Sequence, residues 1–131
     1  MKKFVSLLLT VVLLATMLTV FAVPASAEEV FTSGDYKYTV NKDGTATITG
    51  YTGSGGEITI PKTLDGYTVT AIEDAFSGNK SLTKVTILEN INRIDNNAFK
   101  DCSSMTTLTI SEGVKSIGQF AFTECSSLQE V

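Results

Sequence analysis

The two cysteines of this sequence, Cys102 and Cys125, are the side chains whose type and spacing most readily suggest chemistry. Each stands at the same place in one phrase that the sequence repeats, so we expect them at equivalent positions of neighbouring structural units. Units stacked about 5 Å apart would bring the two thiols close enough for a disulfide, and export would permit their oxidation. Burial as free thiols is the other interpretation, because cysteine behaves as a small hydrophobic residue and is among the most buried types.

Metal and nucleophile chemistry need partners that the sequence does not contain. Histidine is absent from all 131 residues, so the commonest metal ligand and the commonest base near neutral pH are both missing. Two isolated thiols fall short of a zinc site, and a cysteine nucleophile would lack its activating base. Residues 41–44 lack the alternating aspartates and the closing glutamate of a calcium loop, which indicates a plain turn. We therefore predict no metal site and no cofactor.

Paired carboxylates are the remaining candidates for acid–base catalysis. The acidic side chains of the repeated region that could form such a pair are Asp95, Asp101, Glu112 and Glu124. All four fall at expected turns, where we interpret them as solvated turn and capping residues. The sequence thus contains no catalytic constellation, and we predict that this chain is not an enzyme.

Residues 1–27 have the pattern of a secretory signal peptide. Lys2 and Lys3 precede an apolar run over residues 4–23, and Ala25-Ser26-Ala27 supplies the small residues that a signal peptidase requires. An uncleaved membrane anchor is the alternative, because about 20 apolar residues can span a bilayer. We expect cleavage after Ala27, no membrane insertion afterwards, and a protein that is secreted or held at the cell surface.

The charge of the mature chain argues against one class of partner. Removal of residues 1–27 would leave eight basic and fourteen acidic residues, a net charge of −6. Nucleic-acid binding requires clustered lysine and arginine, so we expect no nucleic-acid partner.

A repeat organises the rest of the chain. The dipeptide Ala-Phe recurs at equal intervals, as Ala75-Phe76, Ala98-Phe99 and Ala121-Phe122. Further apolar residues recur in the same register around each pair: Ile72, Ile94 and Ile117 before it, and Leu82, Met105 and Leu128 after it. One such unit cannot enclose its own apolar face, but stacked units can.

The repeat predicts a solenoid of the leucine-rich-repeat type. Val85 with Ile87, and Leu108 with Ile110, alternate with polar residues as in a short strand with one buried face. The interval from one Ala-Phe pair to the next lies within the range of leucine-rich repeats, whose strands form a parallel sheet along one side. We expect turns or short helices on the other side.

The segment before the repeats predicts a cap. Residues 36–51, YKYTVNKDGTATITGY, alternate around a turn and indicate a β-hairpin. We assign residues 28–57 to this N-terminal β-hairpin cap and residues 58–131 to the repeats, beginning with a degenerate strand at Ile58 and Ile60. The chain stops at Val131 inside an expected strand, so we expect a truncated last repeat and a longer parent protein; self-association through this end is the alternative.

The polar positions between the buried strand residues are the candidate binding site. They form an expected strip on the strand face of the solenoid: Lys84, Thr86, Thr107, Thr109 and Glu130. Good β-propensity on an exposed sheet would also explain the threonines.

The phrase IDNNAFKDCSSMTTLTISEGVKSIGQFAFTECSSLQEV closely resembles the BspA-type leucine-rich repeats of bacterial surface and secreted proteins. The resemblance covers about residues 58–131; the first copy departs from it by one residue before Ala75 and by Asn79 in place of cysteine. It implies a non-catalytic, exported interaction or adhesion module that binds a protein or glycan partner, since the family includes adhesins for host matrix proteins. The alternative is a spacer or targeting region of a larger secreted enzyme, a peptidase or cell-wall hydrolase, with its catalytic domain beyond residue 131.

Overall fold

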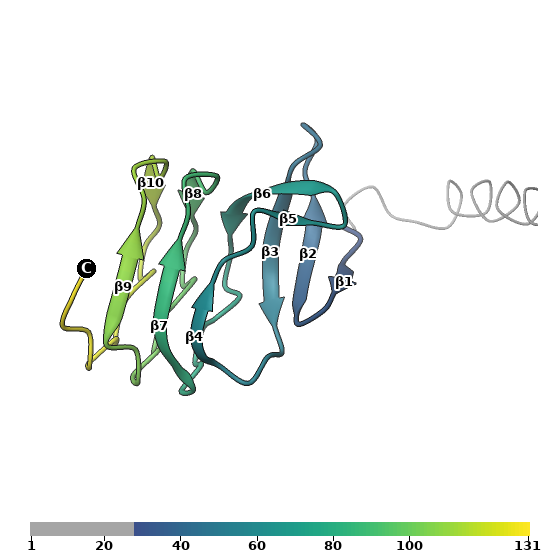
Figure 1. Ribbon diagram of the computed structural model, residues 1–131. Helices are drawn as coiled ribbons and strands as arrows, with labels where there is room; N and C mark the ends of the chain where they lie inside the picture. Colours follow the sequence, from purple (N-terminus) through teal and green to yellow (C-terminus); the bar gives the residue numbers. More distant parts are fainter. Residues whose placement is uncertain (1–27) are drawn as a thin grey trace, which may run out of the picture.

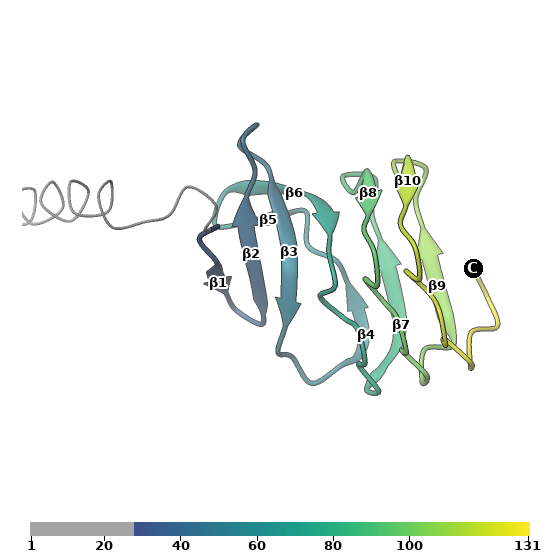
Figure 2. The same ribbon diagram turned by 180° about the vertical axis from the view of Figure 1, so that it is seen from behind.

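The computed structural model describes residues 28–131, which form two sheets on opposite sides of a flattened coil (Figures 1 and 2). The predicted signal peptide lies outside the described residues. The strands in the described range are β1 (Phe31–Ser33), β2 (Tyr36–Val40), β3 (Ala46–Tyr51), β4 (Gly56–Thr59), β5 (Thr63–Leu64), β6 (Tyr67–Ile72), β7 (Leu82–Ile87), β8 (Arg93–Ile94), β9 (Thr107–Ile110) and β10 (Ser116–Ile117). A larger sheet has the order β1-β2-β3-β6-β8-β10, with β5 paired to β6, and a smaller one has the order β4-β7-β9.

The repeats contribute strands to both sheets, whereas the sequence predicted a parallel sheet along one side only. In the smaller sheet, β7 pairs in parallel with β4 and with β9, so that Val85 lies beside both Ile58 and Leu108. In the larger sheet, β8 pairs in parallel with β6 and β10, which aligns Ile94 with Ile72 and Ile117. The predicted solenoid with parallel strands is confirmed.

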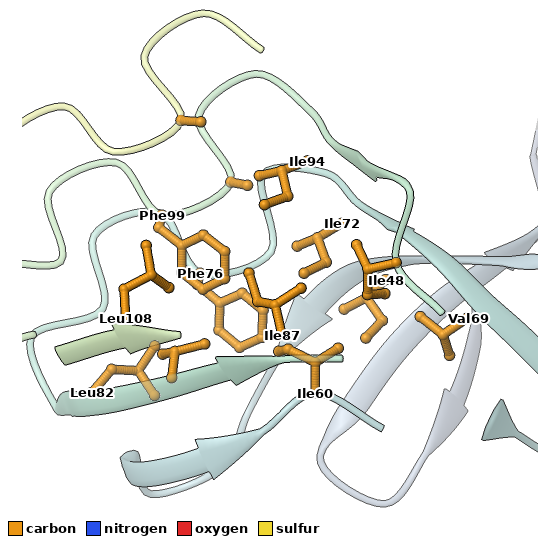
Figure 3. Close-up of a cluster of buried hydrophobic side chains, with 14 of the residues drawn as sticks. Ile48, Ile60, Val69, Ile72, Phe76, Leu82, Ile87, Ile94, Phe99 and Leu108 are labelled. Carbon is orange, nitrogen blue, oxygen red and sulfur yellow. The ribbon is translucent and has the colours of Figure 1, made fainter. Parts of the chain in front are cut away.

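The core is a set of columns that run along the stack between the two sheets (Figure 3). The rings of Phe76 and Phe99 are parallel, with centroids 4.9 Å apart, and the ring of Phe122 follows 5.5 Å beyond Phe99. Phe99 is completely buried, and so are the strand residues Val85 and Ile87 that face it across the coil. Full burial of each such side chain contributes about 1.5–3 kcal/mol, which explains why the repeats associate.

Of the turns or short helices expected opposite the strand face, the described residues form turns and short strands, and no helix. The connection from β8 to β9 is a series of tight turns, closed by bonds such as Lys100 N–H to Asn97 O at 3.1 Å and Cys102 N–H to Phe99 O at 3.3 Å. Left-handed residues at Asn97 and Asp101 (φ 60° and 59°) interrupt any helical run. Other amides in these turns bond to the next coil, as Phe99 N–H does to Ala121 O at 2.8 Å.

The one-residue shortening of the first repeat leaves its turn conformation unchanged. Asp74 and Asn97 both have positive φ, 51° and 60°, and each directly precedes the Ala-Phe pair. The missing residue therefore falls between Ile72 and this left-handed position. Phe76 N–H still reaches Ala98 O at 2.9 Å, so the two turns remain in register.

The predicted hairpin is present as β2 and β3, and the structure joins it to the repeats. β3 pairs in parallel with β6, which aligns Ile48 with Ile72 and extends the isoleucine column into the hairpin. β1 adds a third antiparallel strand on the outer edge. A second hairpin, β5 and β6, turns at Asp65-Gly66, where both residues have the positive φ that a two-residue hairpin loop requires.

Candidate interaction surface

The outward face of the smaller sheet carries two straight rows of polar side chains. Strand pairing places Glu57, Lys84 and Thr107 in one row, which a parallel bridge continues to Glu130. The second row contains Thr59, Thr86 and Thr109. Side chains alternate between the two faces of a strand, so these rows point outward because Val85 and Leu108 point inward.

The structure brings the five predicted strip residues onto one face. Lys84, Thr109 and Glu130 are exposed, and Thr86 and Thr107 are half-buried between their neighbours in the rows. A shallow depression of about 230 Å³ lies at the β4 side of this face, lined by Glu57, Ile58, Thr59, Lys84 and Thr86. The surface therefore offers hydroxyl groups and charges of both signs at regular spacing.

Two residues of this face, Glu57 and Thr59, were not among the predicted strip residues. They belong to β4, which precedes the first recognisable Ala-Phe pair and pairs with β7. The alternation Glu57-Ile58-Thr59-Ile60 was the available signal, because Ile60 is buried and the intervening residues must then face outward.

Both cysteines are free thiols, in equivalent positions of successive coils. Cys102 is buried, and its Sγ–H donates to the carbonyl oxygen of Phe76 at 3.1 Å; Cys125 donates to Phe99 O at the same distance. Burial raises the pKa of Cys102 to about 11 and also raises the pKa of Cys125. Since the thiolate is the reactive form, these side chains are suited to packing and poorly suited to nucleophilic attack.

The four acidic residues considered for catalysis lie at separate turns and edges. Asp95 forms an ion pair with Arg93, with Nε and Oδ2 3.0 Å apart, and Asp101 forms an ion pair with Lys80. Glu112 and Glu124 are exposed. Exposed ion pairs of this kind contribute about 0–1 kcal/mol, so they orient the turns more than they stabilise them.

Residues 41–44 form the connecting loop of the β2–β3 hairpin. Gly44 has φ +83°, and Asp43 Oδ1 accepts bonds from Thr45 N–H at 3.0 Å and Thr45 Oγ1 at 2.6 Å. These bonds to Thr45 lower the pKa of Asp43. The carboxylate is thus engaged in the turn itself.

Over residues 28–131, no group of three or more His, Cys, Asp or Glu side chains is placed to hold a metal ion. In the same part of the chain, no helix has the length and apolar character needed to cross a membrane.

Comparison by sequence connects the repeats to one family. The family model described as BspA type Leucine rich repeat region (6 copies) matches residues 51–131. Among curated proteins, no sequence match is found.

Several solved structures share the fold. A leucine rich cell surface protein from Faecalibacterium prausnitzii A2-165 is 37% identical with a TM-score of 0.73, over 82% of this chain and 31% of that one. A leucine-rich repeat protein of T. pallidum is 27% identical with a TM-score of 0.72, over 79% and 50%. A leucine-rich repeat protein from Bacteroides capillosus is 33% identical with a TM-score of 0.69, over 78% and 80%. The chain thus spans less than a third of the first protein and half of the second.

Proposed function

Because the chain belongs to the BspA-type leucine-rich repeat family, we propose that it is a non-catalytic, exported module that binds a protein or glycan through the outward face of its smaller sheet. The single observation that carries this proposal is the pair of straight polar rows across β4, β7 and β9. The rows lie on a rigid hydrogen-bonded sheet, and a site on strands is held more precisely than one on loops.

Two observations support export of the chain. One similar structure is described as a cell surface protein, and residues 1–27 have the pattern of a signal peptide. We infer export to the surface or the medium, with removal of residues 1–27. In this proposal, residues 28–57 cap the first repeat and keep its apolar side from water, as terminal units of solenoids do.

The chemistry of the face indicates the kind of contact. Lys84 lies between Glu57 and Thr107 in one row, and only threonines occupy the other. Hydroxyls and charges of both signs favour hydrogen-bonded contacts with a polar partner over burial of an apolar one. Three strands give a small contact area, so the affinity of this chain alone should be modest.

The test is binding of the purified chain to a panel of purified host matrix proteins and to a glycan array. Thr109→Lys and Lys84→Glu change the proposed face, and Thr32→Lys on β1 of the larger sheet is the matched control. We expect a partner whose binding weakens at least about tenfold in the first two variants and is unchanged in the control, because a buried mispaired charge costs more than about 1.4 kcal/mol. Equal binding by all three variants would exclude this face.

A further inference from the structure

A second polar surface lies on the larger sheet, away from the proposed binding face. It is a groove of about 350 Å³ between the tip of the β2–β3 hairpin and β8, with the end of β6 as its floor. Figure 2 shows the hairpin tip and β8 on the same side of the molecule. Its lining comes from the loop before β3, from β6 and from the turn into β8: Asn41, Lys42, Asp43, Thr45, Thr70, Ala71, Asn92 and Arg93.

One wall of the groove is held rigid by hydrogen bonds. Thr45 Oγ1 donates to Asp43 Oδ1 at 2.6 Å, and it accepts bonds from Asn41 Nδ2 at 2.9 Å and from Thr70 Oγ1 at 3.1 Å. Thr47 Oγ1 adds a bond to Asn41 Oδ1 at 3.0 Å. The hairpin loop is therefore tied to β6, and a ligand would meet a surface that loses little conformational entropy on binding.

The opposite wall presents the guanidinium of Arg93. Its Nε lies 3.0 Å from Asp95 Oδ2 in an ion pair, and about half of the side chain remains exposed. Strand pairing places Arg93 beside Ala71 on one side and Ser116 on the other. Ala71 is too short to cover the guanidinium, and the exposed half of the Arg93 side chain can pair with a carboxylate.

The charge in the groove differs from that of the chain. Lys42 and Arg93 outnumber Asp43 among the lining residues, and the charges at the groove cancel when Asp95, which pairs with Arg93, is counted; the chain as a whole has a net charge of −4. The volume is near the lower end of the range for small-molecule sites, roughly 300–1,000 Å³. The lining consists of amides, hydroxyls and charges, so an apolar ligand would gain little from burial there.

We propose that this groove is a binding site for an acidic saccharide, a sugar unit that carries a carboxylate. The carboxylate pairs with Arg93 and Lys42, while sugar hydroxyls donate to Asp43 Oδ2 and exchange hydrogen bonds with the Asn92 amide. This site is separate from the strip on the smaller sheet, and the proposal does not depend on the proposed function.

The test is titration of the purified chain with galacturonic acid oligosaccharide and with its methyl ester, which has the same hydroxyls and no charge. We expect saturable binding of the acid and at least tenfold weaker binding of the ester, because charge-assisted hydrogen bonds are about twice as strong as neutral ones. Chemical-shift changes should centre on the amides of Thr45 and Arg93. Failure of the acid to bind, or equal binding of acid and ester, would overturn the proposal.

Two variants locate the site. Arg93→Gln should weaken binding of the acid about tenfold or more through loss of the bidentate pair. Lys37→Gln removes the same charge from β2, at the end of the hairpin away from Asp43, and should change nothing. Thermal unfolding of both variants checks that they fold. A weakening by Lys37→Gln but not by Arg93→Gln would overturn the assignment. Equally tight, Arg93-dependent binding of a polyglutamate peptide would also overturn it, because it would indicate a carboxylate site without saccharide recognition.

Discussion

The ring of Tyr51 in β3 lies 5.2 Å from the ring of Phe76 in the first repeat. Tyr36 in β2 lies 5.3 Å beyond Tyr51, so that the hairpin and the repeats share one aromatic column that runs on to Phe122. The hairpin thus covers the side of the first repeat with side chains of the same shape that the next repeat would supply.

Replacement of Tyr51 by alanine should therefore loosen the hairpin. We expect Tyr51→Ala to lower the free energy of unfolding by about 2–4 kcal/mol, because it removes a half-buried ring and two aromatic contacts. Tyr51→Phe keeps the ring and loses only a bond from Gly55 N–H at 3.3 Å, so it should cost less than about 1 kcal/mol. Urea unfolding measures both, and equal losses would contradict the shared column.

Gly113 reports on the close approach of coils. A Cβ atom at this position would overlap the carbonyl oxygen of Glu89 in the preceding coil, and the φ of Gly113 is not positive. We expect Gly113→Ala to cost about 2–3 kcal/mol through this overlap. Gly44→Ala is the control: it has open space but φ +83°, and should cost about 1 kcal/mol. A smaller loss for Gly113→Ala than for Gly44→Ala would count against the close stacking.

Phe120 occupies a left-handed position that suits other residues better. Its φ is 60°, the same as that of the equivalent Asn97, and its side chain is 59% exposed. Asparagine tolerates this conformation and a bulky residue does not, so Phe120→Asn should raise the free energy of unfolding by about 0.5–1 kcal/mol. The loss of its contact with Lys100, 6.0 Å from the ring centroid, offsets part of the gain.

Denaturant unfolding of the two single variants Phe120→Asn and Lys100→Ala separates the effect of the backbone strain from that of the contact with Lys100. Lys100→Ala removes the cation and leaves the strained backbone, so it should not stabilise the chain. A lower stability for Phe120→Asn than for the unchanged protein would show that the ring is needed for packing.

Because the Cys102 thiol is buried, the free energy of unfolding should fall at alkaline pH. The folded state holds the pKa of Cys102 at about 11, above the ordinary value of 9.0, so between these values the unfolded chain binds fewer protons. The free energy of unfolding is then retained below pH 9 and falls as the pH rises toward 11. Cys102→Ser should flatten this part of the profile, as measured by urea unfolding at several pH values; an unchanged slope would mean that the thiol ionises freely.

Two tyrosines with raised pKa values should make the free energy of unfolding fall further at still higher pH. Burial, with Tyr51 and Asp35 nearby, raises the pKa of Tyr36 to about 12. The hydrogen bond to Asp65, at 2.7 Å, raises the pKa of Tyr38 to about 12. These groups explain why some slope should remain in Cys102→Ser above pH 10.

The repeat made most of the fold predictable. The constant interval between repeats placed Val85 beside Leu108, and the register of the strands confirms this pairing. The same interval placed the three phenylalanines in one column. These predictions succeed because each repeat buries the same face, so the apolar pattern alone specifies which residues must meet.

The parts outside the repeat were harder to predict. The parallel pairing of β3 with β6 has no sequence signal, because it depends on contacts between distant segments. The shift between Lys37 and Tyr38 in the pairing of β2 with β3 lies opposite Gly50, a glycine inside a strand that is typical of a bulge. Glu57 and Thr59 were missed because β4 precedes β7 by more than one period. The groove at Arg93 was missed because the loop at Asp43 lies far from it in sequence.

Ring-to-ring nuclear Overhauser effects among the phenylalanines test the central claim, that each coil covers its neighbour, most directly. Centroid distances of 4.9 and 5.5 Å predict strong effects from Phe76 to Phe99 and from Phe99 to Phe122, and none from Phe76 to Phe122. Absence of the two neighbouring effects, or a direct effect between Phe76 and Phe122, would contradict the stacked coil and remove the flat sheet on which the proposed binding face depends.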